Sequence, residues 1–320
     1  MSTAGAKRQG WLAALVVVAA ALTLLPAVPS AAALAGGILL AVTLGNPLAE
    51  RTRWLSRKML PAAIIGLGAA MDLPAVLRVG ARGVGYTVLG ISVTFGLGFL
   101  LQRLLAVKRR TGLLIAAGTA ICGGSAIAAA APVLGADDEE ISVALGTVFV
   151  LNSVALLVFP PVGHWLALDQ RAFGLWAALA IHDTSSVVGA SMQYGPTALQ
   201  IGTTVKLARA LWIVPLTMIL GSSRGPEGAV GKPGQRPWFI VGFVVLAALT
   251  SFVPSLHAPG LLVAAGARRA LVLTLFLVGL GLSRKTLRSV GLRPLLLGLA
   301  LWVVMGVGTL AAIRVGLIGI

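Results

Sequence analysis

Long apolar segments, separated by short polar ones, follow one another along nearly the whole chain. A helix that crosses a bilayer needs about 20 mostly apolar residues, and these segments are close to that length. The pattern predicts an all-α polytopic membrane protein with about eleven transmembrane helices, at residues 11–29, 31–49, 59–76, 83–105, 111–135, 140–167, 172–193, 196–221, 237–256, 264–283 and 291–317.

Composition supports a membrane protein and argues against other classes. The 320-residue chain is 58% hydrophobic and 11% charged, with a mean hydropathy of +0.98, and a soluble domain cannot hide that much apolar surface. A net charge of +16 would suggest a nucleic-acid partner in a soluble protein, but the basic residues here fall mostly in short loops. We therefore expect the bilayer, and no nucleic acid, as a partner. The single cysteine, Cys122, rules out a disulfide framework.

The distribution of Lys and Arg predicts the orientation. If the N-terminus is cytoplasmic, basic clusters at 51–58, 103–110 and 284–293 all face the cytoplasm, as the positive-inside rule requires. In this topology Arg171 also lies inside, and the acidic run at 137–140 lies outside. We therefore expect a multi-pass protein of the bacterial inner membrane with its N-terminus in the cytoplasm and its C-terminus in the periplasm.

Two segments bear on the organisation of the chain. Residues 11–29 follow a basic N-terminus and resemble a secretory signal peptide, but another apolar segment begins at once, so a retained first span is predicted. The longest polar break, 222–236, is rich in Gly, Ser, Pro and basic residues and is predicted to be a cytoplasmic linker. It divides one integral membrane domain into residues 1–221, which hold the polar motifs, and 237–320.

Internal similarity suggests a repeat. The string Ala120–Ser125 resembles Ala180–Ser185, and each is followed by a segment that ends in proline. With eleven spans these two strings would have parallel orientation. Separately, Ile65–Gly68 resembles Val278–Gly281, and that pair would be inverted. The two pairs do not fit one simple scheme, and we keep an inverted repeat with broken core helices as the hypothesis.

The first polar site lies around Gly123, Gly124 and Ser125. Two adjacent glycines weaken a helix, and a broken helix at membrane depth exposes N–H groups and a dipole that attract anions. Non-helical backbone is tolerated there only where protein or a water-filled cavity surrounds it. The alternative is close helix packing through small residues.

The second site is the polar run His182, Asp183, Thr184, Ser185 and Ser186 within an apolar segment. A carboxylate at the bilayer centre costs roughly 3 kcal/mol if it faces lipid, so Asp183 must face the protein interior, pair or be protonated. At helical spacing His182 and Ser186 share a face. The pair His182 and Asp183 could carry a proton, which predicts a coupling or gating role. The alternative is a hydrogen-bonded structural knot between helices.

The third site is a polar stripe of Thr203, Lys206 and Arg209 on the next segment. Two cations against one Asp183 leave a net positive charge, which suits an anion. One cation could pair with Asp183. The alternative is snorkelling of both side chains to a membrane face, although Lys206 lies about fifteen residues, roughly 22 Å, from the cytoplasmic end of its span.

Other chemistry finds little support in the sequence. No cluster has metal-ligand spacing, no nucleotide motif is present, and we expect no cofactor. An intramembrane enzyme would use Ser186 or Cys122 with His182, but no third residue orients the histidine, so no catalytic residue is predicted. A passive anion channel remains an alternative. Asn152 is a lesser polar position, and Gly-rich spans permit packing within one chain as readily as between copies in a homo-oligomer.

Three strings together resemble a known family. They are Ala120-Ile-Cys-Gly-Gly-Ser-Ala-Ile-Ala-Ala-Ala-Ala-Pro132, the pair Phe173-Gly-Leu-Trp176 and Ala180-Ile-His-Asp-Thr-Ser-Ser-Val-Val188, and Lys206-Leu-Ala-Arg209 leading to Pro215. They resemble the YeiH-like family of sulfate exporters, conserved hypothetical proteins of bacterial inner membranes. The resemblance implies a secondary transporter linked to sulfonate or sulfur metabolism. It also implies a distant relation to bile-acid and cation–proton transporters, with core and scaffold domains and crossed, broken helices.

Sites and resemblance lead to one predicted function, the export of a small anion such as sulfate or sulfite. The Gly123–Gly124 break would supply backbone donors, and Lys206 and Arg209 would supply positive charge. The hydroxyls of Ser125, Ser185 and Ser186 would bind oxyanion oxygens.

Overall fold

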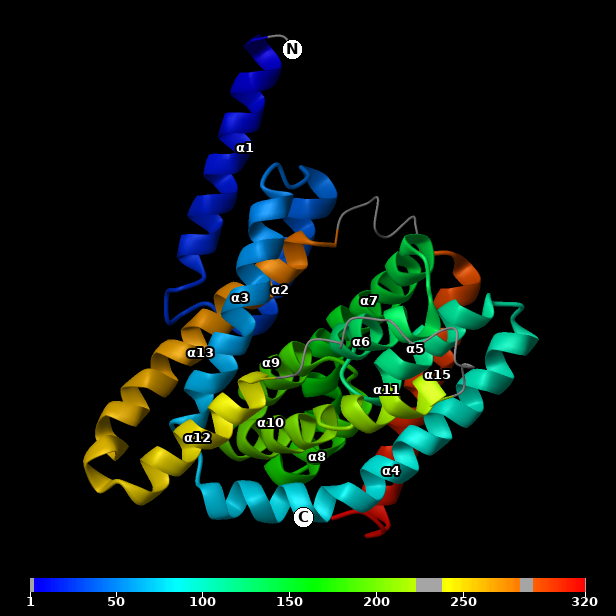
Figure 1. Ribbon diagram of the computed structural model, residues 1–320. Helices are drawn as coiled ribbons and strands as arrows, with labels where there is room; N and C mark the ends of the chain where they lie inside the picture. Colours follow the sequence, from blue (N-terminus) through cyan, green and yellow to red (C-terminus); the bar gives the residue numbers. More distant parts are fainter. Residues whose placement is uncertain (1–2, 223–237, 283–289, 320) are drawn as a thin grey trace. The chain divides into compact units, whose positions relative to one another are not determined.

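The computed structural model describes residues 3–222, 238–282 and 290–319, and every regular element in those residues is helical. Figure 1 labels the helices. Their bounds are α1 Thr3–Leu22, α2 Ser30–Thr43, α3 Ala49–Gly68, α4 Leu73–Leu104, α5 Arg109–Ala120, α6 Gly124–Leu134, α7 Asp138–Trp165, α8 Gln170–Ala180, α9 Thr184–Tyr194, α10 Pro196–Ala210, α11 Ile213–Ser222, α12 Trp238–Phe252, the 3₁₀ turn η2 Pro254–Leu256, α13 His257–Leu280 and α15 Leu292–Arg314. Each of the eleven predicted segments overlaps at least one of these helices. The predicted linker, 222–236, lies almost wholly outside the described residues.

Several helices suit a bilayer by length and composition. Five described stretches are long and apolar enough to cross one, and they are Val84–Leu104, Asp138–Trp165, Pro196–Leu220, Pro254–Leu280 and Leu292–Arg314. Shorter apolar helices occur at Gln9–Leu22, Ser30–Thr43, Gly124–Leu134 and Phe239–Phe252. The predicted class, a helical membrane protein, is confirmed at this level.

The chain divides into two compact units, and the first comprises residues 1–75 and 238–287. Within its described residues, α13 packs along α2 and α3, and glycines allow the backbones to approach closely. A Cβ added at Gly66 would meet Ala267, and one at Gly279 would meet backbone atoms of Leu34 and Ile38. The similar strings Ile65–Gly68 and Val278–Gly281 therefore hold glycines that permit close helix packing.

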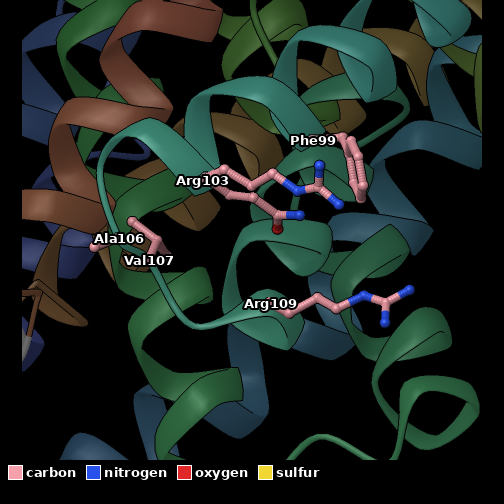
Figure 2. Close-up of a pocket in the computed structure, with 6 residues that line it drawn as sticks. Phe99, Arg103, Ala106, Val107 and Arg109 are labelled. Carbon is pink, nitrogen blue, oxygen red and sulfur yellow. The ribbon is translucent and has the colours of Figure 1, made fainter.

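The second unit, residues 76–237 and 288–320, holds all three polar sites. Its first helix pair is α5 and α6, which follow α4 after a turn at Ala106 and Val107 (Figure 2). Lys108 Nζ lies 3.7 Å from Glu139 Oε1, although α5 and α6 separate the two residues in sequence. Arg110 Nη1 likewise lies 4.0 Å from Glu140 Oε2. The start of α5 and the end of α6 are thus neighbours, so the pair folds back on itself, and we call it the first hairpin.

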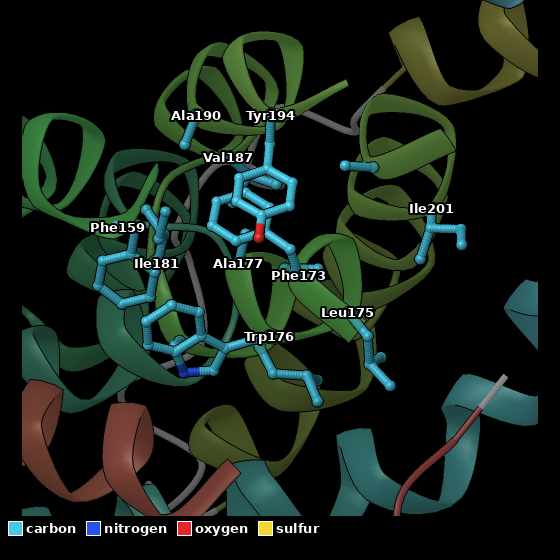
Figure 3. Packing of buried hydrophobic residues seen from close by; sticks show 14 of the residues in the cluster. Phe159, Phe173, Leu175, Trp176, Ala177, Ile181, Val187, Ala190, Tyr194 and Ile201 are labelled. Atoms are coloured by element: carbon cyan, nitrogen blue, oxygen red, sulfur yellow. The ribbon is translucent and has the colours of Figure 1, made fainter. Parts of the chain in front are cut away.

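Helices α8 and α9 form a second hairpin in the same way. Tyr194 Oη, at the end of α9, donates a 2.6 Å hydrogen bond to the carbonyl of Leu168, just before α8. The rings of Tyr194 and Phe173 stack with centroids 3.7 Å apart. Figure 3 shows Tyr194 and Phe173 stacked in this buried cluster, near Trp176 and Phe159. The aromatic cluster therefore holds the open end of the second hairpin together.

The 28-residue helix α7 connects the hairpins and sets their directions. The first hairpin has its open end at the N-terminus of α7, through the ion pairs of Glu139 and Glu140. The second has its open end at the C-terminus of α7, where His164 stacks on Tyr194 at 4.3 Å. Since α7 spans roughly 42 Å at 1.5 Å per residue, the hairpins enter the unit from opposite ends.

Hairpin geometry bears directly on the predicted span count. Residues 111–135 and 172–193 were each expected to cross the membrane once, but each folds back to the end from which it started. The structure therefore does not confirm eleven spans. The two similar strings, Ala120–Ser125 and Ala180–Ser185, form the tips of these hairpins, and the hairpins run in opposite directions rather than in parallel.

Candidate functional site at the hairpin tips

The tips of the two hairpins meet at Gly123. A Cβ added to this glycine would lie 3.3 Å from Asp183 Cβ and 3.4 Å from the carbonyl oxygen of His182. Gly123 has a φ of +64°, a backbone conformation that residues with a Cβ rarely adopt. Glycine therefore meets two requirements here, a left-handed backbone and a close approach to the other tip.

Asp183 begins α9 as its N-cap. Its Oδ2 accepts hydrogen bonds from the backbone N–H of Ser185 at 3.0 Å and of Ser186 at 3.3 Å. The hydroxyl of Ser185 donates to the same oxygen. The carboxylate thus lies on the positive end of the α9 dipole and satisfies N–H groups that the helix leaves unpaired.

Arg209 joins the tips from α10. Its Nε donates to the carbonyl of Ala120, the last residue of α5, at 2.6 Å, and its Nη1 donates to the carbonyl of Leu179 in α8 at 2.7 Å. One guanidinium therefore binds the C-terminal end of the first helix in both hairpins. A planar cation with several fixed donors is suited to that geometry.

Lys206, one turn earlier on α10, forms hydrogen bonds with the second hairpin only. Its Nζ donates to the carbonyl of Ile181 at 2.7 Å and lies 3.4 Å from that of Ala178. The Lys206 side chain has no exposed surface, and Arg209 is 1% exposed. The snorkelling alternative is thereby excluded for both residues. No ion pair joins either cation to Asp183 in the described residues, so the structure does not show the pairing that the sequence left open.

Asn152 fixes the second tip from α7. Its Oδ1 accepts a 3.1 Å hydrogen bond from the backbone N–H of His182. Asn152 lies near the middle of α7, so the tips meet near the middle of the longest helix in this unit. The sequence marked Asn152 only as a lesser polar position. Its lone polar side chain in an apolar segment was the available signal.

Four helix ends converge at this crossing, and their charges are unequally compensated. The negative ends of α5 and α8 are bound by Arg209 and Lys206, and the positive end of α9 is bound by Asp183. The positive end of α6 has Gly123 as its N-cap and no side-chain cap. Only the Cys122 thiol meets it, through a hydrogen bond with the Ala126 backbone. Among these four ends in the described residues, the α6 N-terminus is therefore the one that no charged side chain binds, although Asp183 lies beside Gly123.

Exposure separates the predicted site residues into two groups. Ser125 is exposed, and Gly124 and Asp183 are half-buried. Within the other group, His182 and Lys206 have no exposed surface, and Arg209, Ser185 and Ser186 are 1%, 2% and 6% exposed. The structure brings all of the predicted residues to the two tips and α10. In this conformation, a solute could reach only the first group.

Two sequence alternatives can be compared with this geometry. The helix is broken at 121–123, as the broken-helix hypothesis predicted, and Gly118 also packs closely on Ile127. The ring nitrogens of His182 have no hydrogen-bond partner, so the histidine activates neither Ser186 nor Cys122 in this conformation. Among the residues that the structure describes, no group of three His, Cys, Asp or Glu side chains could hold a metal ion.

Comparison with known proteins gives matches over nearly the whole chain. A family described as conserved hypothetical protein 698 matches residues 9–298. The UPF0324 membrane protein Bd1437 of Bdellovibrio bacteriovorus is 56% identical over 303 residues, which cover 93% of each chain. The UPF0324 membrane protein GSU2818 of Geobacter sulfurreducens is 50% identical over 92% of this chain and 94% of that protein. A UPF0324 membrane protein of Porphyromonas gingivalis is 47% identical, covering 88% and 86%.

No solved structure matches the chain. The family relation therefore rests on sequence, and the relatives are named only as membrane proteins. Identity above 40% across most of both chains leaves no ambiguity about membership. The chain belongs to the UPF0324 family of membrane proteins, which is the YeiH-like family that its motifs resemble.

Proposed function

We propose that this protein is a secondary transporter that exports a small anion, such as sulfate or sulfite, across the bacterial inner membrane. The observation that carries the proposal is the N-terminus of α6, which no side chain caps, at the meeting point of the hairpins. Its first backbone N–H groups and its dipole favour an anion, and Ser125 adds an exposed hydroxyl donor. An oxyanion with several acceptor oxygens fits a site of clustered N–H and O–H donors.

The buried cations Lys206 and Arg209 of α10 support the same proposal. Lys206 and Arg209 donate hydrogen bonds to carbonyls at the C-terminal ends of α5 and α8, which compensates the negative ends of those helices. Without the two cations, the two carbonyl-rich ends of α5 and α8 and a carboxylate would repel an anion. In the proposal the two cations therefore act through the electrostatic potential at the site rather than by direct contact with the anion. The two cations outnumber the one carboxylate of Asp183, so in the proposal the net charge of the site is positive.

The arrangement of the hairpins supports transport rather than static binding. The hairpins enter the unit from opposite ends, and the tips meet halfway along α7. In the proposal, movement of one hairpin opens the site to one side while the other keeps it closed, which is the logic of alternating access. The inverted repeat that the sequence suggested enters the proposal as the two oppositely directed hairpin units, each followed by a long helix.

Asp183 has a distinct role in the proposal. Asp183 lies beside Gly123, and its negative charge repels an anion at the start of α6. Removal of this charge would remove the repulsion, so we assign Asp183 to coupling. Because His182 is fully buried against the same tip, we assign it to gating, through its backbone bond to Asn152.

Transport by purified protein tests the proposal. Radiolabelled sulfate, sulfite and taurine are offered to proteoliposomes, with and without a pH gradient and a membrane potential. Anion flux that responds to the pH gradient at fixed potential supports the transporter. Flux that follows the electrical driving force alone supports the passive channel, and absence of flux for every anion contradicts the proposal.

One pair of variants isolates the α6 N-terminus. Ser125→Asp places a permanent carboxylate on the open helix end and competes with the substrate, whereas Ser125→Asn has similar size without the charge. The side chain is exposed, so neither change disturbs the packing. We expect Ser125→Asp to abolish flux and Ser125→Asn to retain most of it. Equal flux in the two variants would move the anion site away from α6.

A further inference from the structure

The helix that carries Lys206 and Arg209 is interrupted directly after Arg209. Helices α10 and α11 form one apolar stretch, Pro196–Leu220, that is long enough to cross a bilayer, yet they separate at Leu211 and Trp212. The Leu211 N–H donates to the carbonyl of Ala208 at 3.3 Å, and the Trp212 N–H donates to that of Arg209 at 3.1 Å. Bonds between residues three apart form a 3₁₀ turn, and such a turn inside a helix often marks a hinge.

Pro215 explains why the helix is interrupted at this point. A proline has no N–H, and its ring clashes with the carbonyl four residues earlier, which here belongs to Leu211. The Leu211 carbonyl instead accepts a 3.3 Å hydrogen bond from the N–H of Val214, another bond between residues three apart. The turn therefore lacks the regular α-helical bonds that would stiffen it.

Helix α10 belongs to the second hairpin. Its main contacts are with α8 and α9, and glycines allow the backbones to approach closely. A Cβ added at Gly174 of α8 would lie 2.7 Å from the carbonyl oxygen of Ala198, and one at Gly202 would meet Ser191 of α9. Lys206 adds its hydrogen bond to the second tip. We therefore treat α8, α9 and α10 as one rigid body.

Helix α11 belongs to the first hairpin. Its main contact is with α6, and in the described residues it has no comparable packing on α8 or α9 (Figure 1). Ile213 and Leu216, which share one face of α11, are 5% and 8% exposed. Val214 and Met218, by contrast, are 46% and 70% exposed. The buried face of α11 thus connects it to the first hairpin, which approaches from the opposite end of the unit.

The interruption at Leu211 and Trp212 consequently joins two separately packed bodies. We propose that it is a hinge about which α11 and the first hairpin turn relative to α8, α9 and α10. Arg209 lies directly before the hinge, and its hydrogen bond to the carbonyl of Ala120 crosses from one body to the other. This bond is then the latch that holds the described conformation. The inference rests on the proposed transport function, because alternating access needs such a joint.

Distances between paired spin labels test the hinge in the full-length protein. Pairs of cysteines are introduced in a Cys122→Ser background, and double electron–electron resonance is measured in nanodiscs with and without sulfate. Labels at Met218 and Arg171 span the hinge, whereas labels at Met218 and Arg109 lie within the first body, and all three side chains are exposed. We expect two distance populations for the first pair and one for the second. One population for both pairs in both conditions, or two for both pairs, would overturn the hinge.

A matched pair of proline variants locates the hinge. Pro215→Ala supplies the missing N–H, and one recovered hydrogen bond should lower the fraction of the minor distance population roughly fivefold. Pro161→Ala makes the same change at an exposed position of α7 and should leave both populations as they are. An unchanged ratio in Pro215→Ala, or an equal change in Pro161→Ala, contradicts the proposal. So does a lower melting temperature of Pro215→Ala in detergent, because the variant should gain a helical bond.

The outcomes for the hinge and for transport can be told apart. Two populations that collapse in Pro215→Ala, in a protein without flux of any anion, would support the hinge and contradict the proposed function. Anion flux in a protein with one population throughout would support the function and overturn the hinge.

Discussion

Arg209 Nε donates a 2.6 Å hydrogen bond to the carbonyl of Ala120, and this contact ties α10 to the tip of the first hairpin. The bond is buried, and the same guanidinium also holds the second hairpin. Its position makes Arg209 a structural link between two elements that approach from opposite ends.

Replacement of Arg209 by methionine should therefore destabilise the protein. Each carbonyl left without a donor costs about 1–3 kcal/mol. Arg209→Lys keeps the charge but cannot bind both carbonyls, so we expect an intermediate loss. Thermal unfolding in detergent measures both, with Arg51→Met on exposed surface as the control. A melting temperature unchanged by Arg209→Met would contradict the assigned link.

Substitution of Gly123 by alanine should be costly for a different reason. The backbone has a φ of +64°, and the added Cβ would lie 3.3 Å from Asp183 Cβ. Strain at such a φ costs on the order of 1–3 kcal/mol. Gly36→Ala, in α2 and with open space around the added Cβ, is the matched control and should be neutral or stabilising. The expected order of melting temperatures is reversed if the tip does not adopt this conformation.

Anion affinity should rise when the negative charge of Asp183 is removed. That charge opposes an anion at the α6 N-terminus, and Asp183→Asn removes it while keeping the size of the side chain and an oxygen that can cap α9. Binding of labelled sulfate to the purified wild type and variant at one pH checks this. Weaker binding in Asp183→Asn than in the wild type would refute the assigned role of Asp183.

Cysteine labelling should reveal the hairpin topology. In a Cys122→Ser background, single cysteines replace Lys108, Asp138 and Arg171, all at exposed positions. The hairpins put positions 108 and 138 on one side and 171 on the other. Eleven spans would put 108 and 171 together and 138 opposite. A membrane-impermeant maleimide added to right-side-out and inverted vesicles separates the two patterns.

The sequence located the helices and the break but not the direction of the chain after the break. The two glycines at 123 and 124 predict a broken helix because they remove side-chain packing and permit unusual backbone. Hydropathy, however, depends on residue type and length, and a folded-back pair such as α5 and α6 has the same length and apolarity as one crossing helix. Complementary charges at Lys108 and Glu139 were the signal that the two ends meet.

Contact partners inside the site were less predictable than its members. The sequence predicts Lys206 and Arg209 as cations within a membrane span, and the structure buries both. Their partners are main-chain carbonyls rather than Asp183, because broken helices present unpaired carbonyls that a strong donor satisfies. A sequence shows side-chain charges directly, whereas helix-end carbonyls become visible only once the break is placed in space.

The ends of α7 have a further consequence for experiments on this family. Compared with eleven spans, two consecutive hairpins place the residues between them, including Asp138 and Arg171, on the opposite side of the membrane. After the second hairpin the two topologies agree again. Reporter proteins fused to either terminus would therefore give the same result for nine crossings and for eleven. Agreement of terminal fusions with a hydropathy plot would leave the central third of the chain assigned to the wrong side of the membrane.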